Sequence, residues 1–320
     1  MKIKPILVVG REPNSVFFEI FFKSITSNKF KSPIILIMSL DLIIKQMKFL
    51  NYKKKINLIK IKNIKRYKLD NKQINLIDVK YKNNIAFKKI SNDSNSYIEN
   101  CFKTAFYLIK KKITNKFING PINKKTFLKN KYLGITEYIC EKFKIKNYAM
   151  LIYNHKLSVC PITTHLPIKL VSKSINKKNI YNKVILINNF YKKMFGIKPR
   201  IAVVGLNPHC ETIDNFDEDK KIVKPTIQKL INKKLNIYGP ISADTIFMKN
   251  IRFNYDVIIG MYHDQVLTPI KTLFEYNAIN ITLGLPFIRI SPDHGPNEKM
   301  MGKKISNAQS LIESLKFLDF

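Results

Sequence analysis

The sequence predicts an α/β fold with a mostly parallel sheet covered by helices on both faces. Short, continuously apolar segments such as residues 5–10 and 33–38 alternate with amphipathic segments, which is typical of buried parallel strands joined by helices. The chain has 320 residues, enough for two lobes around a sizeable core. No two of its 10 glycines stand two positions apart, so the GxGxxG turn of a Rossmann dinucleotide site is absent.

The first third of the chain follows this alternation closely. Its expected elements are strands at 5–10, 33–38 and 56–61 and helices at 15–25 and 40–50. Another helix is expected to begin near Ser96, because Glu99 stands three residues later, as in a capping box. Its inner face should carry the apolar residues that recur at helical spacing, namely Ile98, Cys101, Ala105, Leu108 and Ile109.

The remaining two thirds predict the same kind of alternation. Expected strands lie at 117–119, 148–153, 157–164, 201–204, 257–261 and 280–285, and expected helices lie at 176–195, 218–234, 243–250 and 307–318. The segment from residue 256 to residue 302 also holds two His, three Asp, two Lys and one Arg between short apolar runs. Polar side chains at strand ends are how open α/β sheets form binding sites, so we interpret this segment as the wall of an active site.

The formal net charge is +35, from 57 basic and 22 acidic residues, and such a charge often indicates a nucleic-acid partner. Here the lysines are spread along the whole chain without an arginine-rich face, and Lys, Asn and Ile are over-used together. We interpret the charge as drift toward A/T-rich codons and expect no nucleic-acid partner. The positive potential should still attract an anionic substrate or dinucleotide.

The four cysteines are widely separated and form no CxxC pair, which excludes the usual zinc-knuckle spacing and provides no disulfide framework. A reducing compartment is therefore expected. The apolar run at residues 5–9 is too short for a signal peptide, and no run of about 18 apolar residues exists for a membrane span. These features predict a soluble, cytoplasmic protein without a membrane partner.

Three of the five histidines directly follow strands or lie in turns: His165, His209 and His263. Strand ends can converge on one point, and three neutral imidazoles suit a divalent metal with an open position for substrate. The alternative is that each is a hydrogen-bonded structural residue, and the spacing alone does not decide between the two.

Charged and amide side chains flank the strand expected at 280–285. Lys271 precedes it, Asn280 begins it and Arg289 follows it. Most lysines here are expected to be surface charge, but Arg289 stands between two isoleucines, where an arginine is usually paired with a carboxylate or a phosphate.

Two further positions allow two interpretations each. Asp293, His294 and Gly295 form either a tight turn or a place where a ligand approaches the backbone, because Gly295 has no side chain. Asp244 follows Gly239 and Pro240 and is either a helix N-cap or a carboxylate that holds substrate or a catalytic water.

Nine short motifs occur in an order that resembles the 4-hydroxythreonine-4-phosphate dehydrogenases, a family of pyridoxal-phosphate biosynthesis. They are GPINK from Gly120, TEY from Thr136, TTHLPIK from Thr163, LNPH from Leu206, GPISADTIF from Gly239, MYHDQ from Met261, PIK from Pro269, NITLGLPFIR from Asn280 and DHG from Asp293. The resemblance runs from about residue 118 to the C-terminus and is thin before it.

The resemblance implies a two-lobed isocitrate/isopropylmalate dehydrogenase-like fold. Residues 1–125 with 275–320 would form a discontinuous first lobe on the cofactor side, and 126–274 a central lobe with the metal ligands and the dimer interface. It also implies a homodimer whose active site is completed by the partner chain, NAD or NADP as cofactor, and one divalent metal (Zn, Mg or Co) per site.

The resemblance assigns roles to the residues already singled out. His165, His209 and His263 match the metal ligands, and Thr136, Lys271, Asn280 and Arg289 match the substrate contacts, while Asp293, His294 and Gly295 resemble a cofactor-binding turn. We assign catalysis to Lys271 and Asp244; Asp244 and metal-bound solvent are alternatives for the proton acceptor.

The implied reaction is metal-dependent oxidation of the secondary hydroxyl of 4-phosphooxy-L-threonine by NAD, followed by decarboxylation to 3-amino-2-oxopropyl phosphate. Departures from the family pattern leave alternatives open: Ile135 replaces a usual His, and the segments 10–14, 210–214 and 296–297 lack the usual residues. The alternatives are a related dehydrogenase of another phosphorylated hydroxy acid and a degenerate, inactive dimer; a nucleic-acid-binding protein would explain only the charge.

Overall fold

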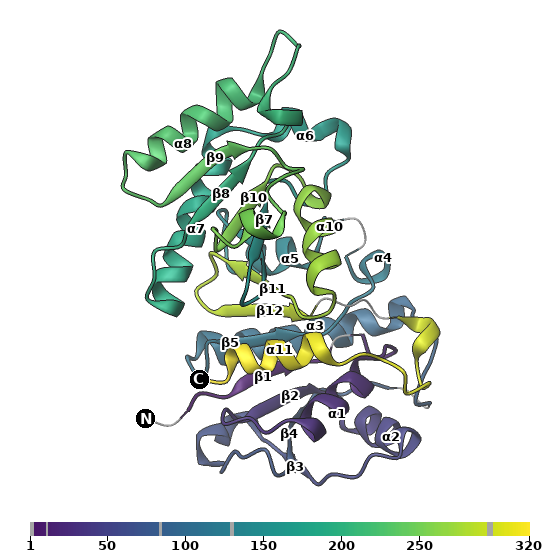
Figure 1. Cartoon of the computed structure of the whole chain (residues 1–320). Coiled ribbons are helices and arrows are strands. Elements are labelled where there is room, and N and C mark those ends of the chain that lie inside the picture. Colours follow the sequence, from purple (N-terminus) through teal and green to yellow (C-terminus); the bar gives the residue numbers. More distant parts are fainter. Residues whose placement is uncertain (1–2, 11, 83–84, 129–130, 293–296) are drawn as a thin grey trace. The chain divides into compact units, whose positions relative to one another are not determined.

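The computed structural model describes residues 3–10, 12–82, 85–128, 131–292 and 297–320. The chain divides into two compact units, each of alternating strands and helices (Figure 1). Residues 1–138 and 286–320 form the first, which we call the terminal unit, and residues 139–285 form the second, the central unit. The lobe boundaries expected at 125 and 275, and the roles assigned to those lobes, stay predictions.

The sheet of the terminal unit is parallel, with the strand order β3-β4-β2-β1-β5-β12. Its strands are β1 (Ile6–Val9), β2 (Ile34–Met38), β3 (Ile56–Leu58), β4 (Ile74–Asp78), β5 (Lys116–Asn119) and β12 (Ile288–Pro292). Every residue of β1 and β2 is buried, as their continuous apolar sequences predict for strands covered on both faces. In register, Val8 lies between Leu36 and Ile118.

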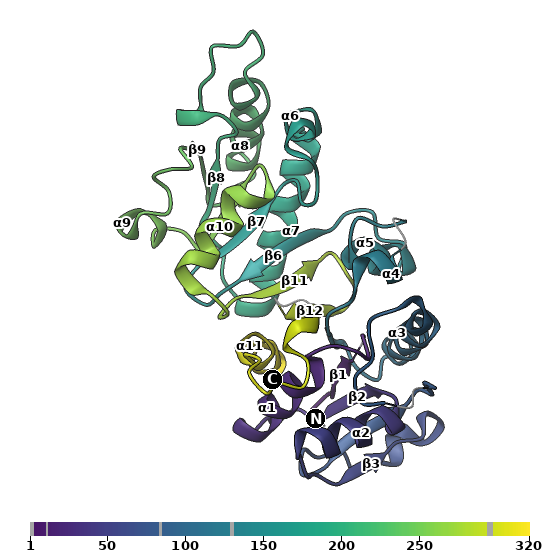
Figure 2. The same ribbon diagram turned by 90° about the vertical axis from the view of Figure 1, so that its right-hand side faces the viewer.

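Helices cover both faces of this sheet. They are α1 (Phe17–Ser27), α2 (Leu40–Leu50), α3 (Asn95–Lys110), α4 (Lys124–Phe127) and α11 (Gln309–Leu318), with 3-10 turns η1 (Ile61–Arg66), η2 (Asn92–Ser94) and η6 (Glu298–Met300). Figure 2 shows α1 and α11 on one side of β1 and β2, with α3 on the other. The helix α5 (Ile135–Lys142) spans the boundary between the units.

The capping box expected at Ser96 is wrong. The helix α3 begins at Asn95 after Ser94, and Ser94 makes no side-chain capping bond. Glu99 lies within the helix and pairs instead with Lys103, at 3.2 Å. The expected inner face is confirmed, because its five apolar residues are all buried. The apolar period therefore locates this helix better than its capping residues do.

The central unit has the strand order β11-β6-β7-β10-β8-β9, in which β6 is antiparallel to both neighbours and the other pairs are parallel. Its strands are β6 (Ala149–Tyr153), β7 (Ser158–Pro161), β8 (Ile201–Val204), β9 (Ile237–Ile241), β10 (Val257–Gly260) and β11 (Ile279–Leu283). Buried side chains of the sheet and of one helix, among them Val159, Ile258 and Ile270, form its core.

The helices of the central unit are α6 (Val171–Ser174), α7 (Lys177–Phe195), α8 (Lys224–Ile231), α9 (Lys249–Arg252) and α10 (His263–Phe274), with short turns η3 (Ile168–Leu170), η4 (Pro208–Cys210) and η5 (Asp219–Val223). The helix expected at 243–250 is wrong, because 243–247 form turns. The strand β9 and the helix α10 were not predicted. Gly239 and Pro240 interrupt β9, which is only partly buried, and Pro269 lies inside α10, so both lack the usual pattern.

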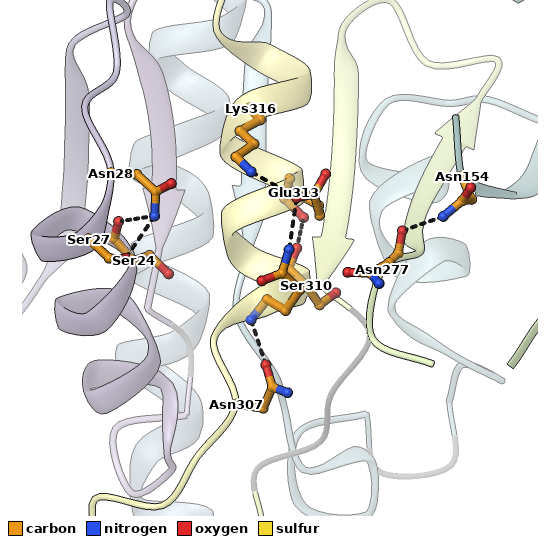
Figure 3. Close-up of polar contacts among 11 residues, drawn as sticks. Ser24, Ser27, Asn28, Asn154, Asn277, Asn307, Ser310, Glu313 and Lys316 are labelled. Carbon is orange, nitrogen blue, oxygen red and sulfur yellow. Dashed lines mark hydrogen bonds and ion pairs between the residues drawn. The ribbon is translucent and has the colours of Figure 1, made fainter. Parts of the chain in front are cut away.

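Polar side chains fasten several element ends (Figure 3). Near the end of α1, the Nδ2 of Asn28 donates to the Oγ of Ser27 at 2.8 Å. In the central unit, the Nδ2 of Asn154 donates to the carbonyl oxygen of Asn277 at 2.9 Å, as Figure 3 also shows. This bond ties the turn between β6 and β7 to the segment entering β11.

Among the described residues, no helix combines the length and apolar character that crossing a membrane requires.

Candidate active site

A fully buried arginine lies in the sheet of the terminal unit. Arg289 is on β12, opposite Phe117 of β5, and its side chain is 0% exposed. Its Nε donates to the Oδ1 of Asn119 at 2.6 Å, and its Nη1 donates to the Oγ1 of Thr136 at 3.1 Å. These two acceptors orient the guanidinium. A guanidinium held in this way is suited to bind a carboxylate or phosphate through its planar fork.

Asn119, at the end of β5, was missed by the sequence reasoning. Its Nδ2 donates to the Oγ of Ser291 at 2.8 Å, which leaves its Oδ1 directed at Arg289. The available signal was its position at a strand end, directly before Gly120 and Pro121. Thr136 lies in the first turn of α5. The structure thus brings together two of the predicted substrate contacts, Arg289 and Thr136, through contacts within one unit.

The other two predicted substrate contacts lie in the central unit. Lys271 lies in the last turn of α10, and partial burial lowers the pKa of its ammonium group. Asn280 lies on β11, opposite Ile152 of β6. Its Oδ1 is buried and accepts no hydrogen bond within the part of the chain that the structure describes. Such an acceptor typically costs about 1–3 kcal/mol, a cost that a ligand donor would remove.

Two of the three predicted metal ligands lie side by side in the central unit. His165 is in the loop after β7, and His263 is the first residue of α10, directly after β10. Because β7 and β10 are parallel neighbours, their loops leave the same edge of the sheet. The two ring centroids are 5.9 Å apart. With metal–nitrogen bonds of about 2.1 Å, two imidazoles on one tetrahedral cation have ring centres roughly 5 Å apart. The pair therefore fits a shared cation.

Each of these two loops is held by hydrogen bonds. The Nδ1 of His263 lies 2.6 Å from the Oδ1 of Asp264, which leaves its Nε2 available to a ligand. Metal-binding histidines usually have their second nitrogen hydrogen-bonded in this way. The backbone N–H and the Oγ1 of Thr163 both donate to the carbonyl oxygen of Met261, at 3.1 and 2.8 Å. This contact joins the His165 loop to the start of α10.

His209 is placed differently. It lies in η4 after β8, is exposed, and has the left-handed backbone conformation, with φ 54°. Cys210 after it is also left-handed, with φ 63°. Left-handed residues other than Gly cost about 1–2 kcal/mol each. Within the described part of one chain, no group of three or more His, Cys, Asp or Glu side chains is placed to hold a metal ion. The triad stays a prediction.

Asp244 is exposed in the turn 243–247 that follows β9. Its interpretation as an N-cap is wrong, because the next helix, α9, begins only at Lys249. Burial raises the pKa of the Cys210 thiol, and the charges of Asp219 and Asp244 add to this effect. The charge of Asp244 therefore acts on Cys210, the residue after His209. The predicted cofactor residues Asp293, His294 and Gly295 lie outside the described residues.

A buried glutamate in the terminal unit was also missed. Glu12, in the loop after β1, is 1% exposed, and its Oε2 has no hydrogen-bond partner among the residues described. Burial, with a smaller contribution from the nearby Glu298, raises its pKa to about 7, against a hydrogen bond from the backbone of Asn14 that lowers it. The loop lies at the boundary between β1 and β5, where the strand order reverses, which is the usual ligand position in such sheets. Its position in a polar loop directly after a strand was the sequence feature that could have identified Glu12 as a candidate site residue.

Comparison with known proteins gives a consistent result. The family model described as pyridoxal phosphate biosynthetic protein PdxA matches residues 29–318. A 4-hydroxythreonine-4-phosphate dehydrogenase from Sulfurihydrogenibium sp. (strain YO3AOP1) is 40% identical over 246 residues, covering 76% of this chain and 74% of that protein. A D-threonate 4-phosphate dehydrogenase from Pectobacterium atrosepticum is 33% identical over 227 residues, covering 69% of this chain and 70% of the relative.

Solved structures agree. A 4-hydroxythreonine-4-phosphate dehydrogenase from Klebsiella pneumoniae superposes with a TM-score of 0.85 at 27% identity, covering 98% of both chains. A terephthalate 1,2-cis-dihydrodiol dehydrogenase from Burkholderia xenovorans LB400 has a TM-score of 0.65 at 17% identity, which shows likeness of fold alone. The predicted α/β fold with a mostly parallel sheet and helices is confirmed.

Proposed function

Because the chain belongs to the family of pyridoxal phosphate biosynthetic protein PdxA, we propose that it oxidises the secondary hydroxyl of 4-phosphooxy-L-threonine. The β-keto acid formed then loses carbon dioxide to leave 3-amino-2-oxopropyl phosphate. The observation that carries this proposal is Arg289, a fully buried cation held by Asn119 and Thr136. A substrate with both a phosphate and a carboxylate offers anionic groups that the planar fork of an arginine binds well.

The chain's own residues bind and orient this substrate. Arg289 binds one anionic group, and Thr136 and Asn119 hold the guanidinium in place. Lys271 contributes a second cation, and the buried Oδ1 of Asn280 accepts a hydrogen bond from the substrate amine or hydroxyl. Because its pKa is lowered by burial, Lys271 also gives up a proton more readily than an exposed lysine, which suits a role in proton transfer. Asp244, whose charge acts on Cys210, and solvent bound to the cation are the two alternatives for the group that accepts the hydroxyl proton.

The cofactors follow from the same reaction. Bound NAD or NADP would accept the hydride, and a bound divalent cation (Zn, Mg or Co) would favour loss of the hydroxyl proton and stabilise negative charge on oxygen. His165 and His263 would hold the cation, and their separation and the Asp264 contact fit that task. We place His209 as the third ligand.

We propose a homodimer in which the second copy completes this site. The support is that His165 and His263 pair within one chain, while the described residues of one chain hold no three-ligand group. We also propose a cytoplasmic location. Cys101 and Cys160 are buried thiols outside any disulfide, a state that a reducing compartment preserves.

The test is absorbance of the reduced nicotinamide on mixing the chain with NAD and 4-phosphooxy-L-threonine, with and without chelator. We expect NADH formation that chelator abolishes and that added Co²⁺ or Zn²⁺ restores. Formation of NADH that chelator leaves unchanged would remove the metal from the proposal. If no NADH forms under either condition, and no NADPH forms when NADP replaces NAD, the proposed dehydrogenase activity is contradicted.

A second candidate substrate is D-threonate 4-phosphate. Relatives named for that activity are 33% identical to this chain, and Ile135, beside Thr136, replaces the expected histidine. Turnover measured with both compounds decides between them. A kcat/KM that is higher for D-threonate 4-phosphate by tenfold or more would favour this candidate over 4-phosphooxy-L-threonine.

A further inference from the structure

The loop that carries His209 is fastened by one buried carboxylate. Asp219 begins the short π-helical turn η5 and is 0% exposed. Its Oδ1 accepts a hydrogen bond from the backbone N–H of Leu206 at 2.7 Å, and its Oδ2 accepts one from the backbone N–H of Asn207 at 2.9 Å. Both donors lie within three residues of His209. A carboxylate that accepts two backbone N–H bonds is a strong, charge-assisted anchor.

Neighbouring side chains reinforce this anchor. The Nδ2 of Asn207 donates to the Oδ2 of Asp219 and to the Oε2 of Glu218, each at 3.2 Å. Glu218 in turn accepts a hydrogen bond from the Oγ of Ser172. The loop is thus connected through two acidic residues to the segment at the start of η5 and to α6.

Gly205 shows how closely the loop is packed. A Cβ placed on Gly205 would lie 2.8 Å from the Sγ of Cys210 and 3.1 Å from the Oδ1 of Asp219. Both of these atoms therefore pack directly against the backbone that leaves β8. The turn of left-handed residues at His209 and Cys210 is unfavourable by itself. It needs an anchor on its N-terminal side, and Asp219 supplies one.

We propose that Asp219 is a positioning residue that holds the His209 imidazole where it can bind the cation. This inference rests on the proposed metal site. In this role Asp219 acts on His209 through the backbone of Leu206 and Asn207. Outer partners of metal ligands typically contribute 10-fold to 100-fold to metal affinity.

The experiment is titration of the metal-free, full-length chain with Co²⁺, followed by the visible absorption of the bound ion. Asp219→Asn keeps the size of the side chain but replaces one acceptor by an NH₂ group that opposes a backbone N–H. We expect Co²⁺ affinity to fall about 10-fold or more, with a changed absorption spectrum. Gly205→Ala, which leaves Asp219 in place but crowds it, should weaken Co²⁺ binding in the same direction.

Two controls separate positioning from general loss of stability. Asp214→Asn changes an exposed carboxylate on the same loop and should bind Co²⁺ as the unchanged chain does. Val184→Ala removes buried apolar volume from α7 in the same unit, so it lowers stability without touching the loop. If Val184→Ala weakens Co²⁺ binding as much as Asp219→Asn does, the positioning role is wrong.

The outcomes distinguish the two levels of the proposal. An unchanged chain that binds no Co²⁺ would contradict the metal site, and the role of Asp219 with it. An unchanged chain that binds Co²⁺, together with an equal affinity in Asp219→Asn, would contradict only the role of Asp219. If Asp219→Asn does not fold, the Co²⁺ affinity of Gly205→Ala is the deciding measurement. An unchanged Co²⁺ affinity in that variant would contradict the positioning role of Asp219.

Discussion

In the terminal unit, the guanidinium of Arg289 is fully buried and is held by two side chains of the same chain, whereas in the central unit His209 is exposed on a left-handed turn. In the first arrangement the guanidinium is already oriented, so the anion binding proposed for it would need little reorganisation. In the second, His165 and His263 lie side by side. In the proposed anion site the cation is oriented by contacts within the chain, whereas in the proposed metal site two of the three expected ligands lie side by side among the described residues.

The largest expected effect on activity comes from replacing Arg289. Arg289→Lys keeps the positive charge but loses the fork that contacts both Asn119 and Thr136. We expect kcat/KM to fall by about 100-fold or more, because losing one partner of a buried charged contact costs about 2–5 kcal/mol. The control is Arg200→Lys, which alters a partly exposed pair with Asp256 and should stay within about twofold. A decrease of less than threefold in Arg289→Lys would show that the arginine is structural only.

The proposed metal site of the central unit is tested by Co²⁺ binding. His263→Ala should weaken Co²⁺ binding by about 100-fold, because it removes one of the ligands paired within a chain. His155→Ala, which changes an exposed histidine without a predicted role, should have no effect. If assembly completes the site, diluting the unchanged chain until sedimentation shows monomers should also weaken Co²⁺ binding. Equal Co²⁺ affinity in monomer and dimer would contradict the proposal that a second copy completes the metal site.

Glu12 is a second buried ionisable group of the terminal unit, and unlike Arg289 it is less stable in its charged form than in its neutral form. Its pKa of about 7 in the folded chain lies above the ordinary value of 4.5. The protonated form is therefore favoured by folding, and its stabilising contribution is present below pH 4.5 and is lost as the pH rises through 7. A shift of this size corresponds to about 3 kcal/mol.

The measurement is the free energy of unfolding by denaturant between about pH 5 and pH 8. Glu12→Gln should lack this part of the pH dependence and should be more stable than the unchanged chain at pH 8, by up to about 3 kcal/mol. Glu99→Gln, on the surface of α3, serves as the matched control. Parallel pH curves for the unchanged chain and Glu12→Gln would refute the buried, neutral carboxyl.

The smallest effect should come from Thr136→Val, which keeps the shape of the side chain but removes the acceptor for the Nη1 of Arg289. We expect about a 10-fold decrease in kcat/KM, since a hydrogen bond to a charged group contributes about 1.5–3 kcal/mol at most. Thr136→Ser should restore activity to near the original level, because it retains the hydroxyl. Failure of Ser to do better than Val would show that the hydroxyl is not what orients Arg289.

Continuous apolar runs and apolar periods in the sequence were enough to locate the most deeply buried elements. The strands β1 and β2 and the buried face of α3 were located from it, because apolar period reflects burial directly. The elements β9 and α10 were missed, because Gly239, Pro240 and Pro269 interrupt their patterns while neighbouring strands and packing keep them in place. The ordered motifs also located Arg289, Thr136 and His263 as candidate residues. A local motif indicates which side chains carry the chemistry, but it does not give the distances between them.

Which of those side chains meet depends on how the chain folds. The contact of Arg289 with Asn119 joins residues 170 positions apart, and the pairing of His165 with His263 depends on β7 and β10 being neighbours. The burial of Glu12 and of Asp219 likewise depends on segments distant in sequence or on loops without a regular period. Burial and distance are properties of packing between such segments, and they determine the charge and the orientation of each group in the candidate site.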